Sequence, residues 1–285
     1  MKIIKAKNGG FCFGVKSAVD AVKRNAGEHT YTLGDVIHNE RVTTELRALG
    51  VKTVDSVDEI HDDEATVVIR SHGAPPEVYD EIVRRGYKLI DATCPFVKKI
   101  HELVRAHHED GYKIVIIGNA DHPEVKGING WCGFDATIAD ENFDFSSLDA
   151  DVKTCFVEQT TFSTEKYLQI LKKIQKDRFK TVEIFDTICY TTVSRQNEAK
   201  KLSGICDKII VVGSPNSSNT RKLIEIADSG RAQAFGVSGA AELNSLNFCA
   251  DDTVGVIGGA SAPEESIMEV IKYMSQEFTK AVNEE

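Results

Sequence analysis

The chain has 285 residues, of which 41% are apolar and 27% are charged, and this balance is ordinary for a globular protein with a sizeable core. Its formal net charge of -10, without any block of clustered Lys and Arg, argues against a general nucleic-acid-binding surface. The apolar runs are strand-sized, far below the roughly 18 residues of a membrane span, and no signal peptide precedes the first strand. We therefore expect a cytoplasmic protein.

Apolar strands alternate with amphipathic helices from one end of the chain to the other, which predicts an α/β fold with mainly parallel sheets. After an opening strand, MKIIKAKNGG, two further strands end in polar loops, YTLGDVIHNE and TVVIRSHGAPPE. A helix and a closing strand, KLIDATC, then deliver Cys94.

The same order of elements occurs twice more along the chain. IVIIGNADHPE and CFVEQTTFSTE precede Cys189, while IIVVGSPNSSN and VGVIGGASAPEE follow it. This internal repeat predicts three α/β units, namely residues 1–94, 95–188 and 189–285, the last with a polar C-terminal tail. Because the third unit has no closing strand of its own, we expect the N-terminal strand, residues 1–11, to pair into it. The predicted architecture is a trefoil of three pseudo-threefold-related α/β domains, whose strand carboxyl ends surround a central cluster site.

Three of the seven cysteines, Cys12, Cys94 and Cys189, stand where a strand and loop give way to a helix. Cysteines at equivalent positions of three related units would meet near the axis, and helix N-termini would offset the negative charge of their thiolates. Three thiolates suit a 4Fe-4S cluster with one iron open to substrate, although zinc held by three cysteines and water remains an alternative. The four remaining cysteines are out of register and expected in the core: Cys132, Cys155, Cys206 and Cys249.

The loops that end the strands carry side chains suited to an anionic, oxygen-rich ligand: His38, His72, His122, Glu124, Thr160, Ser217, Ser218, Asn219 and Ser261. The NSSN run opens a helix, where free N–H groups and hydroxyls form an anion cradle. Glu124 is the best general-acid candidate, because a carboxyl in a dry pocket has a raised pKa, with capping of the following helix as its alternative role. Thr160 is expected to orient or pass a proton, with a turn role as its alternative. The other histidines are expected at the surface: His29, His61, His101, His107 and His108.

Nine short motifs in order, GFCFGV, IHNERV, SHGAP, DATCPFV, HPEV, QTTFS, DTICYTT, NSSNT and GASAP, resemble the 4-hydroxy-3-methylbut-2-enyl diphosphate reductase family. The resemblance runs from Gly10 to about Glu265. It implies reductive removal of the allylic hydroxyl, giving isopentenyl diphosphate and dimethylallyl diphosphate in the last step of the methylerythritol phosphate pathway.

The resemblance also implies roles for individual residues. Cys12, Cys94 and Cys189 look like the ligands of one 4Fe-4S cluster. Glu124 looks like the proton source, with Thr160 as its partner near the hydroxyl and His122 beside them. The implied substrate-binding residues are His38, His72, His122, Thr160, Ser217, Ser218, Asn219 and Ser261, and all of them except Thr160 look like the diphosphate pocket. Reduced ferredoxin or flavodoxin is the implied electron donor, because no flavin or nicotinamide motif is evident.

Two other functions are compatible with three cysteines in three similar units. A quinolinate synthase would also hold a 4Fe-4S cluster in this way, but its carboxylate substrates would call for basic side chains in the central loops, where only Arg70 is near. An iron-sulfur sensor or electron carrier binds no small substrate, so it would not need the polar residues of these loops.

Overall fold

The structure is a computed structural model that describes residues 1–280. Its strands form three four-stranded sheets, and every strand pairing in them is parallel. The predicted α/β class with parallel sheets is confirmed. None of the helices in the described part of the chain combines the length and the apolar character that crossing a lipid bilayer would take.

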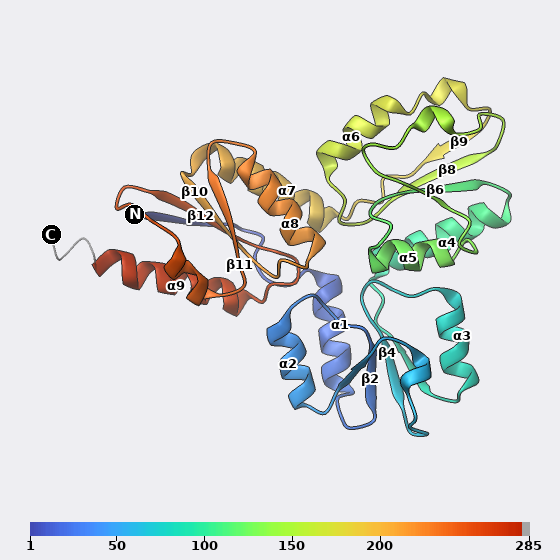
Figure 1. The fold of residues 1–285 in the computed structure, drawn as a ribbon, viewed down its shortest axis with the longest axis horizontal. Helices are drawn as coiled ribbons and strands as arrows, with labels where there is room; N and C mark the ends of the chain where they lie inside the picture. Colours follow the sequence, from blue (N-terminus) through green and yellow to red (C-terminus); the bar gives the residue numbers. More distant parts are fainter. Residues whose placement is uncertain (281–285) are drawn as a thin grey trace. The chain divides into compact units, whose positions relative to one another are not determined.

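The first sheet along the chain has the strand order β3-β2-β4-β5. Its strands are β2 (Thr30–Leu33), β3 (Lys52–Val54), β4 (Thr66–Ile69) and β5 (Lys88–Asp91). The helices of this segment are α1 (Phe13–Arg24), α2 (Glu40–Ala48) and α3 (Pro76–Arg84). In Figure 1, α1 and α2 lie on one side of β2 and β4, and α3 lies on the other.

The second sheet has the order β7-β6-β8-β9. Its strands are β6 (Lys113–Ile117), β7 (Thr137–Ala139), β8 (Thr154–Glu158) and β9 (Val182–Ile184). The accompanying helices are α4 (Pro95–Glu109), α5 (Pro123–Gly130) and α6 (Thr164–Lys173). Helices α4 and α5 cover one face of this sheet, and α6 lies on the opposite side (Figure 1).

The third sheet joins the two ends of the chain. Its order is β1-β12-β10-β11, and β1 pairs with β12 from Lys2 opposite Thr253 to Lys5 opposite Val256. Its strands are β1 (Lys2–Lys5), β10 (Lys208–Val212), β11 (Gln233–Val237) and β12 (Thr253–Gly258). Its helices are α7 (Tyr190–Ile205), α8 (Ser218–Asp228) and α9 (Glu264–Lys280). Of the predicted polar tail, residues 276–280 belong to α9, and the last five residues lie outside the described part.

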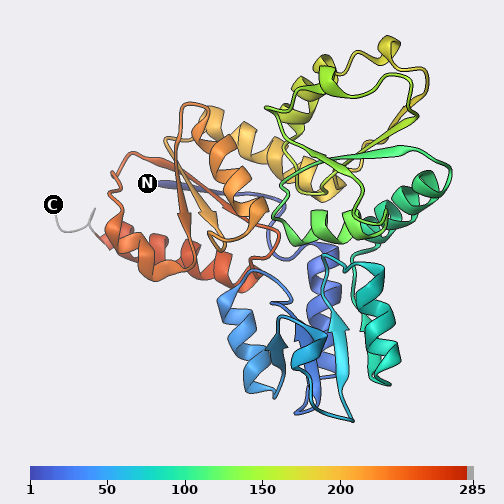
Figure 2. The same cartoon turned by 45° about the vertical axis from the view of Figure 1, so that its right-hand side comes forward.

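Helices on both faces explain why the central strands read as continuous apolar runs. In β10, Ile209 and Val211 face α7 and α8, whereas Ile210 and Val212 pack with residues of α9. The view in Figure 2 shows the same two helical layers on either side of this sheet. Burial on both faces leaves the central strands open to a ligand only at their ends.

The three sheets share one order of strands relative to the chain. In each sheet the first strand (β2, β6 or β10) lies beside the third strand (β4, β8 or β12), and the second and fourth strands lie at the edges. Successive connections therefore leave the first and third strands in opposite directions across the sheet, and ligands of such sheets bind at the carboxyl ends of these two strands. The expected site residues outside the cysteine loops all follow one of these six strands.

By compactness, the chain divides into two units rather than three. One unit contains Met1–Phe13, His38–Glu40 and the chain from Tyr190 onward, and the other contains Gly14–Ile37 and Arg41–Cys189. The third sheet belongs to the first of these units, and the other two sheets belong to the second. The division into three units at residues 94 and 188 stays a prediction.

We predict that the two faces of α3 differ sharply in their effect on stability. Ile82 is completely buried in the core of the first sheet, and its neighbour Val83 is 63% exposed. Ile82→Ala should lower the free energy of unfolding by about 2–5 kcal/mol, because it leaves a cavity. Val83→Ala should change it by less than about 0.5 kcal/mol. Urea unfolding of the two variants measures the difference, and equal losses would contradict the packing of α3 described here.

Candidate functional site

The three cysteines that precede helices are held by the same backbone hydrogen bond. The N–H of Cys94 donates to the carbonyl of Ser71 (3.0 Å), that of Cys189 to Thr160 (3.0 Å), and that of Cys12 to Ala260 (3.2 Å). Each acceptor stands two residues beyond the end of the third strand of its sheet. The three cysteines are therefore structurally equivalent within their repeats, and each is followed directly by a helix.

Cys94 has a glycine pressed against its sulfur. A Cβ atom added to Gly14, the second residue of α1, would lie 2.5 Å from the Sγ atom of Cys94, which is too close for any side chain. Gly14 therefore allows α1 to pack closely against this sulfur. Sequence reasoning missed this role, although the glycine stands two residues after Cys12 in the motif GFCFGV.

The seven cysteines fall into distinct environments. Cys12, Cys94 and Cys189 are partly exposed. Cys132, Cys155 and Cys206 are buried as expected, and burial raises the pKa of Cys132 to about 11 and that of Cys155 to about 12, so both stay neutral thiols. The expectation for Cys249 is wrong, since this residue is exposed in the loop before β12.

Glu124 and Thr160 form a buried hydrogen-bonded pair, and Thr160 is also hydrogen-bonded to Cys189. One carboxyl oxygen of Glu124 accepts the N–H of Thr160 (2.6 Å), and the other accepts its hydroxyl (2.8 Å). The carbonyl of the same threonine accepts the N–H of Cys189. Burial raises the pKa of Glu124 to about 7, because an ionised carboxylate is poorly solvated there, and the two bonds from Thr160 only partly oppose this effect. The pair thus holds a proton near neutral pH beside a cysteine loop.

His122, rather than Glu124, caps helix α5. Its Nδ1 atom accepts the N–H of Glu124 (3.2 Å), which leaves the proton of the neutral ring on Nε2. The ring of His72 lies edge-on to that of His122, with 5.4 Å between centroids. Two imidazoles and the buried carboxyl are thus gathered at the ends of β4, β6 and β8.

The unit that contains the third sheet holds the other polar residues. The Ser217 hydroxyl caps α8 by accepting the N–H of Thr220, and Asn219 Oδ1 accepts the N–H of Ala260. Ser261 and His38 lie on neighbouring loops, since the Ser261 hydroxyl donates to the carbonyl of His38 (3.4 Å). Ser217, Asn219 and Ser261 are all buried, whereas His38 and Ser218 are partly exposed. Hydroxyl and amide groups at a helix N-terminus suit an anion.

Several residues with structural roles at these loops were missed in the sequence. Asn39 donates its side-chain N–H to the carbonyl of Ser261 (2.9 Å), so it joins the two loops that carry His38 and Ser261. Glu158, which is fully buried, accepts the N–H of Thr187 (2.8 Å) and links the end of β8 to the loop before Cys189. The signal for Glu158 was present, because it is an acid inside the apolar run CFVEQ.

The expectation that His101 lies at the surface is wrong. Its ring is 3% exposed and stacks on Trp131 at 5.2 Å, while the indole N–H donates to the carbonyl of Ala74. Burial lowers the pKa of His101 to about 4, so the ring is neutral. A Cβ on Gly73 would lie 2.5 Å from this ring, so His101 packs directly against the loop that carries His72.

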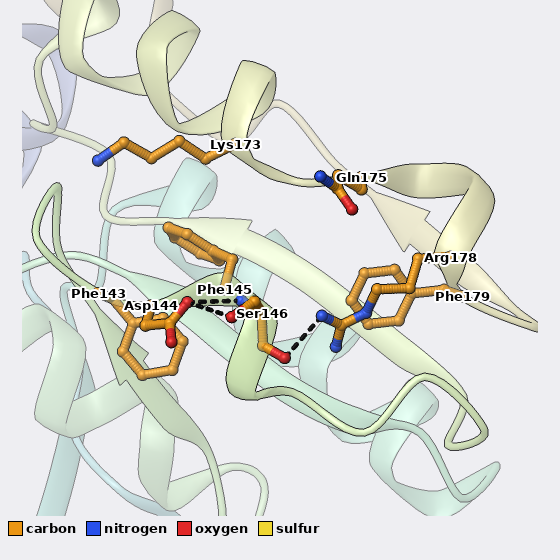
Figure 3. Close-up of a pocket in the computed structure, with 8 residues that line it drawn as sticks. All are labelled: Phe143, Asp144, Phe145, Ser146, Lys173, Gln175, Arg178 and Phe179. Atoms are coloured by element: carbon orange, nitrogen blue, oxygen red, sulfur yellow. Dashed lines mark hydrogen bonds between the residues drawn. The ribbon is translucent and has the colours of Figure 1, made fainter.

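Two hollows within the unit of the first two sheets lie outside the set of expected residues. One, of about 270 Å³, is lined by aromatic rings and by Lys173 and Arg178 (Figure 3). Both cations are already engaged by backbone carbonyls, Lys173 by that of Glu141 and Arg178 by that of Ser146. The other, of about 340 Å³, is lined in part by Arg70 and by Gly73 and Pro123, the sequence neighbours of the two histidines.

Within the described residues, no three His, Cys, Asp or Glu side chains are close enough together to bind a single metal ion. Cys12 belongs to one unit of the chain, and Cys94 and Cys189 belong to the other.

The chain is similar to known proteins over nearly its whole length. A family model described as "LytB protein" matches residues 3–275. A protein of Clostridioides difficile (strain 630) named 4-hydroxy-3-methylbut-2-enyl diphosphate reductase is 39% identical over 280 residues, which cover 96% of this chain and 99% of that one.

Two solved structures share the fold. The E-1-hydroxy-2-methyl-but-2-enyl-4-diphosphate reductase from Plasmodium falciparum superposes with a TM-score of 0.88 at 26% identity, over 97% of this chain and 88% of that one. A structure of (E)-4-hydroxy-3-methyl-but-2-enyl diphosphate reductase, described as the terminal enzyme of the non-mevalonate pathway, has a TM-score of 0.66 at 32% identity, over 97% of this chain and 100% of that one.

We predict that the carboxyl of Glu124 titrates near pH 7. In infrared spectra, the band of the protonated acid should be lost with a midpoint of about 7, and it should be absent in Glu124→Gln. Thr160→Val should raise the midpoint, because the lost hydroxyl no longer favours the charged form. Since the ordinary value is 4.5, the contribution of Glu124 to the free energy of unfolding should be lost as the pH rises from 4.5 to about 7, and the difference between the unmodified protein and Glu124→Gln measures it. A midpoint near 4.5 would contradict the burial of this carboxyl.

Proposed function

Because the chain belongs to the LytB protein family, we propose that it reduces 4-hydroxy-3-methylbut-2-enyl diphosphate to isopentenyl diphosphate and dimethylallyl diphosphate. The reaction removes the allylic hydroxyl as water, which takes two electrons and two protons per substrate. The proposal makes this oxidoreductase the last enzyme of the methylerythritol phosphate pathway to isoprenoids. At the site, the observation that supports the proposal is that Thr160 is hydrogen-bonded both to the buried acid Glu124 and to the backbone of Cys189.

The residues present fit an iron-sulfur cluster. Cys12, Cys94 and Cys189 are partly exposed, share one backbone anchor, and precede helices, whereas the three buried cysteines are enclosed in apolar cores. Gly14 adds no side chain at the Cys94 sulfur, where a Cβ would lie only 2.5 Å away. We assign these three cysteines as the ligands of one 4Fe-4S cluster, which when bound would supply the electrons and a Lewis-acidic iron open to substrate.

Glu124 is proposed as the proton donor of the reaction. Its pKa of about 7 keeps a large fraction protonated at neutral pH, which is the state that a general acid needs. Thr160 fixes both carboxyl oxygens and thereby orients the proton toward the departing hydroxyl oxygen, which leaves as water. His122 lies beside Glu124 because its ring accepts the N–H of that residue, and we place it at the same end of the substrate.

The diphosphate is proposed to bind among the polar loop residues His38, His72, His122, Ser217, Ser218, Asn219 and Ser261. Thr160 is proposed to bind the substrate near its hydroxyl. The buried hydroxyls and the amide at the start of α8 can donate to phosphate oxygens, and the helix N-terminus favours their negative charge. Imidazoles add positive charge when protonated, so the pocket does not need a permanent cation.

The electron donor is proposed to be reduced ferredoxin or flavodoxin, because the chain has no sequence motif for flavin or nicotinamide binding. A cytoplasmic location is part of the same proposal.

The experiment that tests the function is Mössbauer spectroscopy of anaerobically purified, iron-57-labelled protein, with and without the diphosphate substrate. We expect one iron in four to give a distinct signal that changes on adding the substrate. A cluster whose spectrum ignores the substrate would refute the assigned reaction while keeping the three ligands.

We predict that Glu124→Gln keeps its iron and its spectral response to substrate but loses turnover by roughly 10²–10⁴-fold, the usual contribution of a general acid. In the unmodified protein, kcat should decline as the pH rises through about 7, because the acid form of Glu124 is lost. Glu102→Gln, on the exposed side of α4, is the control and should keep full turnover. Normal turnover in Glu124→Gln would remove this residue as the acid.

We predict that Gly14→Ala reduces cluster content. The added methyl group would overlap the sulfur of Cys94 and force either the cysteine or α1 to shift. Iron and sulfide analysis of the purified variant should show a clear loss relative to the unmodified protein. Gly27→Ala is the matched control, because a Cβ there meets no atom within 4 Å. Equal iron content in the two variants would show that this contact does not limit the site.

A further inference from the structure

Arg195, on α7, is a buried cation next to the loop that carries Cys12. It is only 4% exposed, and its two terminal nitrogens donate to the carbonyls of Gly10 (2.7 Å) and Gly258 (2.6 Å). Gly10 stands two residues before Cys12, and Gly258 stands two residues before Ala260, the residue whose carbonyl accepts the Cys12 N–H. Arg195 thus clamps both backbone segments that position this cysteine.

The charge of Arg195 has no carboxylate partner among the described residues. Its interactions there are with carbonyls, and its Nε atom is buried without a hydrogen bond. The nearby acids are engaged elsewhere: Glu198 accepts the backbone N–H of Asn8, and Glu264 pairs with Lys5. Arginine stays protonated in proteins, so Arg195 is a buried, fully charged cation. Burying such a charge is costly unless a negative group compensates it.

We propose that Arg195 is the counter-charge of the iron-sulfur site, which stabilises its reduced form and sets its reduction potential through the Cys12 loop. The inference rests on the proposed function, because it requires Cys12 to be a cluster ligand. Three thiolates and an iron-sulfur core carry net negative charge, and reduction adds one more negative charge. A fixed cation in a poorly solvated place favours the state with more negative charge, and cluster potentials follow the local charge and hydrogen bonding.

The proximity of Arg195 to Cys12 has further support. Burial lowers the pKa of Arg195, and the negative charges of Cys12, Glu198 and Glu264 oppose this shift, that of Cys12 most strongly. Arg195 acts through the loop and the local field rather than by touching substrate, so it is a positioning residue. None of the motifs that resemble the reductase family assigned it a role, although it stands six residues after Cys189 in the run CYTTVSRQ.

The test is a redox titration of the cluster followed by electron paramagnetic resonance in Arg195→Met, Arg195→Gln and Arg195→Lys. Arg231→Met is the matched control, because it removes one arginine from the same unit at the amino end of β11, where its partner is Asp207. We expect the midpoint potential to shift to more negative values in the Met and Gln variants. The Lys variant, which keeps the charge, and Arg231→Met should stay near the unmodified protein.

An unchanged potential in Arg195→Gln with full iron content would overturn the proposal. So would an equal shift in the Lys and Gln variants, because it would show that the clamp matters and the charge does not. If Arg195→Met does not retain its cluster, the Lys and Gln pair still decides the question. The titration needs no substrate, so a cluster that ignores the diphosphate would refute the proposed reaction without affecting these potentials.

Discussion

One backbone hydrogen bond is repeated in all three sheets, and the arrangement of the candidate site depends on it. In each repeat a cysteine N–H donates a hydrogen bond to the carbonyl two residues beyond the third strand. This bond holds the cysteine against the loop that follows that strand. Those loops also carry candidate site residues, such as Thr160 and Ser261. The position of each cysteine is therefore tied to the end of a largely buried strand, which is among the most rigid parts of such a fold.

Burial gives two ionisable groups beside these anchors opposite electrostatic roles. Glu124 becomes harder to ionise in its dry environment, so it holds a proton near neutral pH. Arg195 is buried to a similar degree but keeps its charge, because a guanidinium does not lose its proton in proteins. Glu124 is hydrogen-bonded to Thr160, whose carbonyl accepts the N–H of Cys189. Arg195 is hydrogen-bonded to Gly10, two residues before Cys12. A reductive dehydroxylation requires both protons and electrons, and the fold places a group suited to each beside a cysteine loop.

The sequence predicted the fold class and the candidate residues because both leave local signals. Strands buried on two faces read as apolar runs, and Pro or Ser marks the start of helices such as α4 and α8. The repeat placed the polar loops at corresponding positions, and the structure puts those loops after the first and third strands of each sheet. His101 and Cys249 were misplaced because a single polar or sulfur-containing residue carries no signal of whether a neighbouring element covers it.

The sequence alone determined the candidates for the site: the three cysteines that precede helices, the acid in HPEV, and the hydroxyls and amide of the NSSN run. Only the tertiary structure decided which groups hold them in place. The contacts of Gly14 with Cys94, Glu158 with Thr187 and Arg195 with Gly10 each join residues far apart in the chain. Local sequence patterns extend over a few residues, whereas these contacts exist only after separate strands and helices have packed together.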